Sequence, residues 1–214
     1  MINIIDSRDS RTTSTGQDLI NDLADVLTTK WPSITVVHDT DTPSNVTQIW
    51  LSEDVYIELA SSGAFLYKHD TLGISTERNH MSNSSCYLIV ETDNAVMIHE
   101  YDQGNWNYST AIGTTYNPSD NTESYGAAVQ PSNNNLVAYT DGMYSNSVTS
   151  LNQSFSSAPQ HNEQFVPFTA WNTKDIFPHV YLVTARKSTT RGKILQNGAD
   201  YFYVANMLAI KYTV

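Results

Sequence analysis

One segment near the start of the chain has the hydrophobic pattern of an amphipathic helix. Its apolar residues are spaced three and four apart, so that they fall on one helical face. These residues are Leu19, Ile20, Leu23, Val26, Leu27 and Trp31. Ser14 and Gln17 have the spacing of a capping box, and Pro32 follows the pattern as a stop signal. We therefore predict one helix from Gly16 to Lys30 that packs one face against the rest of the protein.

After Pro32 the pattern changes to short β-branched and aromatic runs separated by turn-forming residues, as in strands. The predicted strands are Ile34–His38, Thr47–Leu51, Asp54–Ala60, Gly63–Lys68, Cys86–Thr92, Ala95–Tyr101, Gln164–Thr169, His179–Ala185, Gly192–Leu195 and a run that begins at Tyr201. Between Asn105 and Asn162 the chain is rich in Asn, Ser, Thr, Tyr and Gly. This composition predicts long polar loops over about 105–162, with brief strand-like pieces at Tyr125–Gln130 and Leu136–Tyr139.

These elements predict a mainly β fold with one N-terminal amphipathic helix. A β-sandwich and a partly open barrel are both compatible with the many short strands. A chain of 214 residues is long enough to bury a sizeable core. We therefore expect a single β-rich domain over residues 1–214.

The segment CYLIVETDNAVMIHEY predicts the best-defined hairpin. A two-residue turn at Asp93-Asn94 pairs Val90 with Met97, Ile89 with Ile98 and Leu88 with His99. Both faces of this ribbon are largely apolar, which indicates a place in the middle of a sandwich or under a second layer.

Two further turns predict hairpins, at Ser62-Gly63 and at Asn197-Gly198. The second turn folds Lys193–Leu195 back on Tyr201–Val204. The segment from Tyr201 to Val214 is apolar on both faces, so we expect it to lie inside the domain or against a neighbouring subunit. Asn206 is expected to mark a bulge or a break between two shorter strands.

Charge and composition exclude several classes of function. A net charge of −11 repels phosphate, so an electrostatic nucleic-acid patch is not expected. Only 15% of residues are charged, so the surface must be polar mainly through Ser, Thr, Asn and Gln. Such groups are cheaper to desolvate than charges, which suits contacts with protein partners or with sugars. Cys86, a single cysteine, excludes an internal disulfide and a zinc knuckle.

The sequence contains neither a run of apolar residues of membrane-spanning length nor an N-terminal segment typical of a signal peptide. We therefore expect a soluble protein that is made in a reducing cytoplasm.

Three combinations of residues raise the possibility of chemistry. Cys86 and His99 are diagonal neighbours in the predicted hairpin, as a nucleophile and its base would be, but nothing supplies oxyanion donors or an exposed position, so a buried core pair explains them better. The tripeptide His-Asp-Thr occurs at His38 and at His69, where turn formation explains it better than metal binding.

Paired carboxylates occur at Glu53-Asp54 and at Glu91 with Asp93, and are expected by chance among 22 acidic residues. His80, His161 and His179 share no ligand spacing. We therefore predict no catalytic, cofactor-binding or metal-binding residues, and no enzymatic activity.

Aromatic residues of the Asn-rich region suggest a binding function instead. Trp106, Tyr108 and Tyr116 could stack on sugar rings while Asn amides bond hydroxyl groups. Tyrosines in loops are equally common in protein interfaces, so the two alternatives stay open.

An N-terminal amphipathic helix, short strands, a charge-poor Ser/Thr/Asn-rich middle and a C-terminal Asn-Gly hairpin together resemble the structural proteins of tailed bacteriophage virions. The resemblance is one of general style and carries over no functional residues. It implies a tail, baseplate, neck or head-decoration subunit that assembles with its own copies, as a homo-oligomer, and with other virion proteins. Such a subunit is made in the host bacterial cytoplasm and ends up in the virion. The alternative expectation is a carbohydrate-binding receptor-recognition module on a phage or bacterial surface.

Overall fold

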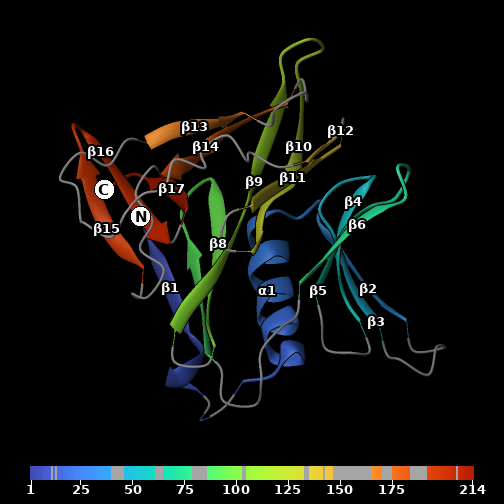
Figure 1. Ribbon diagram of the computed structural model, residues 1–214, viewed down its shortest axis with the longest axis horizontal. Coiled ribbons are helices and arrows are strands. Elements are labelled where there is room, and N and C mark those ends of the chain that lie inside the picture. Colours follow the sequence, from blue (N-terminus) through green and yellow to red (C-terminus); the bar gives the residue numbers. More distant parts are fainter. Residues whose placement is uncertain are drawn as a thin grey trace.

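The computed structural model describes residues 1–10, 12, 14–39, 46–60, 65–78, 86–102, 105–132, 135–141, 143–146, 165–169, 175–183, 192–205 and 207–214. These residues form a mainly β structure with two antiparallel sheets and one α-helix (Figure 1). The larger sheet is curled into a half-barrel, which confirms the predicted fold class.

The small sheet is a meander of five strands in the order β2-β3-β4-β5-β6. Its strands are β2 (Thr35–Asp39), β3 (Val46–Trp50), β4 (Val55–Leu59), β5 (Phe65–His69) and β6 (Ile74–Arg78). The predicted hairpin around Ser62-Gly63 is confirmed in its strands, because Leu59 pairs with Phe65 and Ile57 with Tyr67. The turn itself lies outside the described residues.

The large sheet contains 12 strands, with a main path β1-β7-β8-β9-β14-β17-β16-β15. Its first part is β1 (Asn3–Asp6), β7 (Cys86–Glu91), β8 (Ala95–Asp102), β9 (Asn105–Asn117), β10 (Thr122–Ser132), β11 (Asn135–Thr140) and β12 (Met143–Asn146). Its second part is β13 (Phe165–Thr169), β14 (Ile176–Val183), β15 (Lys193–Asn197), β16 (Asp200–Ala205) and β17 (Leu208–Tyr212). A 3-10 turn, η1 (Ser7–Asp9), follows β1.

Helix α1 (Gly16–Lys30) has the bounds that the hydrophobic pattern predicts. Its capping box, however, is formed by Thr15 and Asp18, so the prediction of Ser14 and Gln17 is wrong by one residue. The Thr15 hydroxyl accepts from the backbone N–H of Asp18 at 3.2 Å, and the Asp18 carboxylate accepts from the N–H of Thr15 at 2.8 Å. The negative charge of Asp18 also interacts favourably with the positive N-terminal end of the helix dipole, whereas a neutral glutamine carries no such charge.

One hydrophobic core fills the space between α1, the small sheet and one face of the large sheet (Figure 1). The helix contributes Leu19, Ile20, Leu23 and Leu27 to it. Polar contacts also join the layers, because Tyr67 Oη lies 3.0 Å from Thr110 Oγ1 and Tyr87 Oη donates to Asp22 Oδ2 at 2.6 Å. The small sheet and the helix are thus both fastened to the same face of the large sheet.

A second core lies on the other face of the large sheet, inside its curl. It includes Leu88, Val90 and Met97 from β7 and β8, whereas Ile89 and Ile98 of the same strands belong to the first core. The pairs Val90–Met97, Ile89–Ile98 and Leu88–His99 confirm the predicted hairpin and its register. Each face of the hairpin is covered by one of the two cores, which explains why apolar residues occur on both faces.

The apolar C-terminal segment lies inside the fold of a single chain. Strand β17 pairs with β14 and β16, and Leu208, Ala209 and Ile210 are fully buried. The predicted pairing of Lys193–Leu195 with Tyr201–Val204 is confirmed, since Lys193 pairs with Val204. Asn197 pairs with Asp200, however, so the two-residue turn is Gly198-Ala199 and not Asn197-Gly198. The sequence predicts that the C-terminal segment lies either inside the domain or against a neighbouring subunit. The structure shows it inside the domain, with β17 between β14 and β16. Asn206 lies outside the described residues.

The strand-like pieces predicted at Tyr125–Gln130 and Leu136–Tyr139 are confirmed as parts of β10 and β11. The prediction of long polar loops over the rest of 105–162 is wrong for the other residues of 105–117, 122–132, 135–140 and 143–146, which belong to strands β9 to β12. Residues 147–162 lie outside the described part of the chain. Hydroxyl side chains fit these strands because they are hydrogen-bonded where they are buried. Ser109 Oγ, for example, contacts Gln130 Oε1 at 3.2 Å and the carbonyl of Ala205 at 3.0 Å.

Candidate functional site

The best candidate for a functional surface is formed by the free edges of the two sheets. Among the described residues, six strands pair with only one neighbouring strand. They are β1, β2, β6, β12, β13 and β15. The outer side of such a strand presents backbone N–H and C=O groups that another strand can pair with.

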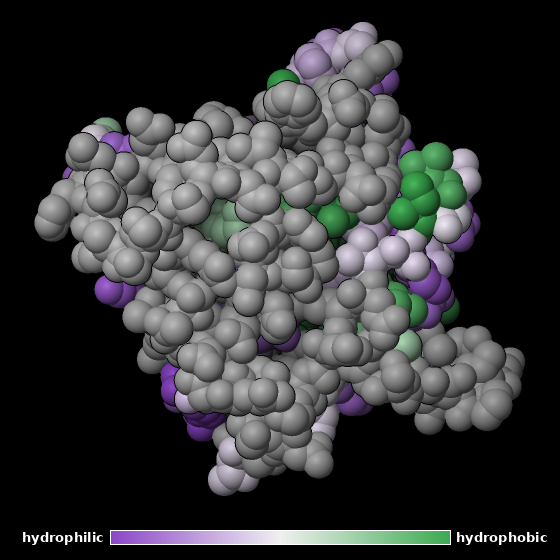
Figure 2. All heavy atoms as spheres, in the orientation of Figure 1, coloured by the Kyte–Doolittle hydropathy of each residue, from purple (hydrophilic) through white to green (hydrophobic). Residues whose placement is uncertain are grey.

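Three of these edges also expose a large apolar side chain. Ile4 on β1 is 39% exposed, Val37 on β2 is 45% exposed and Ile194 on β15 is 50% exposed. The other exposed large apolar residues of the described chain are Met1, Leu72 and Val214. Figure 2 shows an apolar surface at the outer tip of the small sheet, over the turn between β5 and β6. Apolar side chains beside unpaired backbone groups are typical of surfaces that associate with protein.

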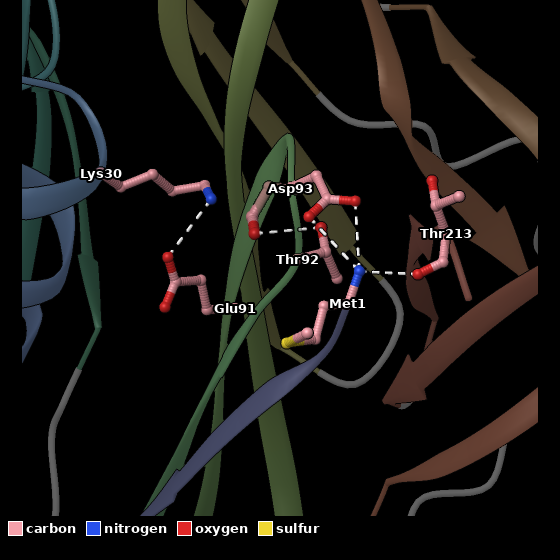
Figure 3. Close-up of polar contacts among 7 residues, drawn as sticks. Met1, Lys30, Glu91, Thr92, Asp93 and Thr213 are labelled. Carbon is pink, nitrogen blue, oxygen red and sulfur yellow. Dashed lines mark hydrogen bonds and ion pairs between the residues drawn. The ribbon is translucent and has the colours of Figure 1, made fainter.

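The edge at β1 is held in place by a group of polar contacts at the β7–β8 turn (Figure 3). The Met1 ammonium donates to the carbonyl of Thr213 at 2.6 Å and lies 3.2 Å from Asp93 Oδ2. Nearby, Lys30 Nζ at the end of α1 lies 3.3 Å from Glu91 Oε1. Glu91 and Asp93, which the sequence offers as paired carboxylates, therefore have different partners. Glu91 pairs with the Lys30 ammonium group and Asp93 with the Met1 ammonium group. Their contacts join β1, α1 and β17 to one turn.

Cys86 and His99 share one face of the β7–β8 hairpin, as the register predicts. Both side chains are buried, and Cys86 belongs to the core inside the curl. A nucleophile must meet its substrate, and this position offers no such access. The geometry favours the core interpretation of this pair over the catalytic one.

The two His-Asp-Thr motifs lie at the ends of strands. Strand β2 ends at Asp39, and β5 ends at His69, where the N–H of Gly73 donates to the carbonyl of Asp70 at 2.9 Å. His38 contacts Thr47 Oγ1 at 3.3 Å, while His69 is buried. No group of three potential metal ligands occurs in the described ranges. His80 and His161 fall outside those ranges.

The aromatic residues that the sequence offers for sugar stacking are spread along one long strand. Trp106, Tyr108 and Tyr116 all lie on β9, but Tyr116 is separated from the first two by about 30 Å of extended strand. The Tyr116 hydroxyl donates to Asn121 Oδ1. An aromatic pair that the sequence analysis missed, Trp50 and Tyr56, stacks instead on the small sheet. The β3–β4 register, Trp50 opposite Tyr56, is the signal that could have found it.

His179 on β14 makes the stability of the fold sensitive to mild acid. Burial, and then the positive charge of Lys211, lower the pKa of His179 below its ordinary value of 6.5. The unfolded chain therefore takes up a proton first, and stability is lost as the pH falls from the ordinary pKa through the lowered one. We expect the unfolding free energy, measured in urea from about pH 7 to about pH 5, to fall less steeply in His179→Asn.

A second variant separates the two causes. Lys211→Gln removes the neighbouring charge but leaves the burial of His179, so the acid-induced loss should begin at the same pH, end at a higher pH and become smaller. Equal slopes in the wild type and His179→Asn would contradict this assignment.

Searches against protein-family models, curated proteins and solved structures found no match to this chain. Within the residues that the structure describes, no helix is long and apolar enough to cross a membrane.

Proposed function

We propose that this protein is a non-enzymatic structural subunit of a tailed-bacteriophage virion, in the tail, baseplate, neck or head decoration. It assembles with copies of itself and with other virion proteins through the free edges of its sheets. The observation that carries the proposal is the exposed apolar side chain on each of β1, β2 and β15. Burying such a side chain together with a newly paired edge stabilises association.

The small charged fraction of the chain supports the same proposal. Only 15% of residues are charged, so an interface can form with few ions to desolvate. The apolar C-terminal strand is not part of the proposed interface, because β14 and β16 already bury it. Assembly therefore depends on the edges and not on the end of the chain.

The proposal places the assembled protein in the virion, after synthesis in the host bacterial cytoplasm. The net charge of −11 gives it no general attraction for nucleic acid, which would let DNA pass without adhering.

The oligomeric state tests this proposal. We expect mass photometry of the wild type to show oligomers, and Val37→Lys and Ile194→Lys to shift the population to monomer. A lysine replaces the buried apolar contact with a charge that resists desolvation, so we expect at least about tenfold weaker association for the edge that is used.

Ser119→Lys is the matched control, since it adds the same charge on an exposed turn between β9 and β10, away from the edges. A wild type that stays monomeric up to high micromolar concentration would overturn the proposal. So would oligomers that Val37→Lys, Ile194→Lys and the corresponding β1 variant Ile4→Lys all leave intact.

A second candidate function, carbohydrate recognition, is favoured by the stacked pair Trp50 and Tyr56 on the small sheet.

A further inference from the structure

The small sheet has one face in the core and one face turned away from it. Side chains alternate between the two faces along each strand. The inward set includes Ile49, Val55, Ile57, Phe65 and Tyr67. The outward set includes Gln48, Trp50, Tyr56, Glu58 and Lys68, and the apolar Val37 and Leu66 lie on the same face, opposite Gln48 and Glu58. We call this outward set, together with Thr35 on β2, the outer platform.

Strand register arranges the outer platform in rows. Thr35 pairs with Trp50, Trp50 with Tyr56 and Tyr56 with Lys68, so these four residues cross the sheet in one line from β2 to β5. Gln48 and Glu58 form the neighbouring row on β3 and β4. The platform is therefore built on paired strands and not on loops, which fixes the positions of its side chains.

The aromatic rings of the first row stand side by side. The Trp50 and Tyr56 ring centroids are 4.3 Å apart at an interplanar angle of 24°. Lys68 Nζ lies 5.4 Å from the centroid of the Tyr56 ring. Tyr56 is only 8% exposed, whereas Trp50 is half-buried. Because Tyr56 covers one face of the indole, the other face is directed towards β2, where the paired residue is the small Thr35.

Hydrogen bonds hold the polar groups of the outer platform in a chain. Trp50 Nε1 donates to Gln48 Oε1 at 3.2 Å, and Gln48 Nε2 donates to Glu58 Oε2 at 2.8 Å. Lys68 Nζ donates to Glu58 Oε1 at 3.0 Å. Gln48 keeps a second amide N–H and a second lone pair, so it can bond a ligand without breaking this chain.

The charges of the outer platform compensate each other. Burial on its own lowers the pKa of Lys68, but the hydrogen bond and the charge of Glu58 outweigh it and raise the pKa above its ordinary value. Lys68 is therefore positive near neutral pH and faces the negative Glu58. The charges of Lys68 and Glu58 nearly cancel, so the platform is almost neutral in a protein whose net charge is −11.

We propose that the outer platform binds a neutral oligosaccharide, with one sugar ring stacked on the free face of Trp50. A pyranose ring has an apolar C–H face for the indole and peripheral hydroxyl groups for Gln48 and Thr35. A purely apolar ligand would leave the polar groups of the platform without partners. An anionic ligand would find no compensating positive charge at this neutral site and would be repelled by the acidic protein.

This site rests on the second candidate function, carbohydrate recognition, and specifies its ligand; it does not depend on the assembly function. A strand that pairs with the edge of β2 extends the sheet in its own plane and covers Val37 at that edge, while Trp50 on the inner strand β3 stays open. Several copies in one assembly would also raise the avidity of a weak single site.

A glycan array of neutral and acidic oligosaccharides, probed with the labelled full-length chain, tests the proposal. We expect wild type to bind neutral oligosaccharides and Trp50→Ala to bind them at least about tenfold more weakly, because the stacking surface is lost. Tyr116→Ala is the matched control, since it removes a half-buried aromatic ring from β9, outside the platform. It should bind as wild type does.

Two further variants distinguish a loss of binding from a loss of folding. Trp50→Phe keeps a stacking ring, and Gln48→Ala keeps the aromatic pair, so both should fold, and the second should bind several-fold more weakly. An absence of binding by wild type, binding confined to acidic glycans, or unchanged binding by both Trp50→Ala and Gln48→Ala would each overturn the proposal. Mass photometry of these variants should match wild type, which separates this test from that of assembly.

Discussion

Replacing Ile210 with alanine will destabilise the folded monomer by about 3 kcal/mol. Ile210 is fully buried on β17, where it pairs with Val180 and Tyr203 and belongs to the core inside the curl. The truncation removes apolar surface and leaves a cavity that the paired strands cannot fill. Urea denaturation at submicromolar protein concentration measures the effect on single chains.

Ile194→Ala is the matched control for this prediction. It removes the same atoms from an exposed position on β15 and should change stability by less than about 0.5 kcal/mol. An effect of Ile210→Ala that appears only at concentrations where the protein oligomerises would show that a neighbouring chain, and not β14 and β16, covers the C-terminal strand.

Gly126→Ala will also destabilise the protein strongly, by about 2 kcal/mol. A Cβ atom on Gly126 would lie 2.4 Å from the backbone oxygen of Tyr139 and 3.0 Å from the ring of Phe177. The first contact is with the backbone of the neighbouring strand β11, so it cannot be relieved by rotating a side chain. Thermal and urea unfolding of the variant measure the cost.

Gly113 provides the comparison, because it pairs directly with Gly126 across β9 and β10. A Cβ atom on Gly113 would lie 3.4 Å from its nearest neighbours, at ordinary contact distance. Gly113→Ala should therefore cost much less than Gly126→Ala. Equal losses in the two variants would mean that a general property of glycine in strands, and not the contact with Tyr139, sets the effect.

Local patterns were sufficient to predict the helix and the hairpins. The helical spacing of Leu19, Leu23 and Leu27 and the stop at Pro32 define α1, because they concern neighbours on one helix. The turn at Asp93-Asn94 fixes the register of its hairpin in the same way, since a two-residue turn determines which residues face each other. The Asn197-Gly198 signal locates the second hairpin, but its turn lies one residue later, at Gly198-Ala199, so the facing pairs differ from those that the signal implies.

Long-range pairing and polar strands could not be predicted from such patterns. Strand β1 pairs with β7, and β9 with β14, across long stretches of chain that no local signal connects. Strand β9 contains buried Ser109 and Thr110, whose hydroxyl groups contact partners on other strands. Composition alone therefore suggested a loop where the structure has its longest strand.

The outer platform was missed for a related reason. Trp50 and Tyr56 are separated in sequence by a short turn and carry no motif, so only the β3–β4 register shows that their rings meet. The aromatic residues offered instead, Trp106, Tyr108 and Tyr116, were chosen by the composition around them. Composition does not say which side chains share a face.

The meander topology of the small sheet bears on the order in which the protein folds. Each of its strands pairs with the next along the chain, so it can form by successive closure of short loops. The large sheet cannot be completed until β14 and β17 have been synthesised, because they join β9 to the C-terminal hairpin. During synthesis on the ribosome, we expect the meander to form early. Its apolar face is covered later, when the large sheet forms.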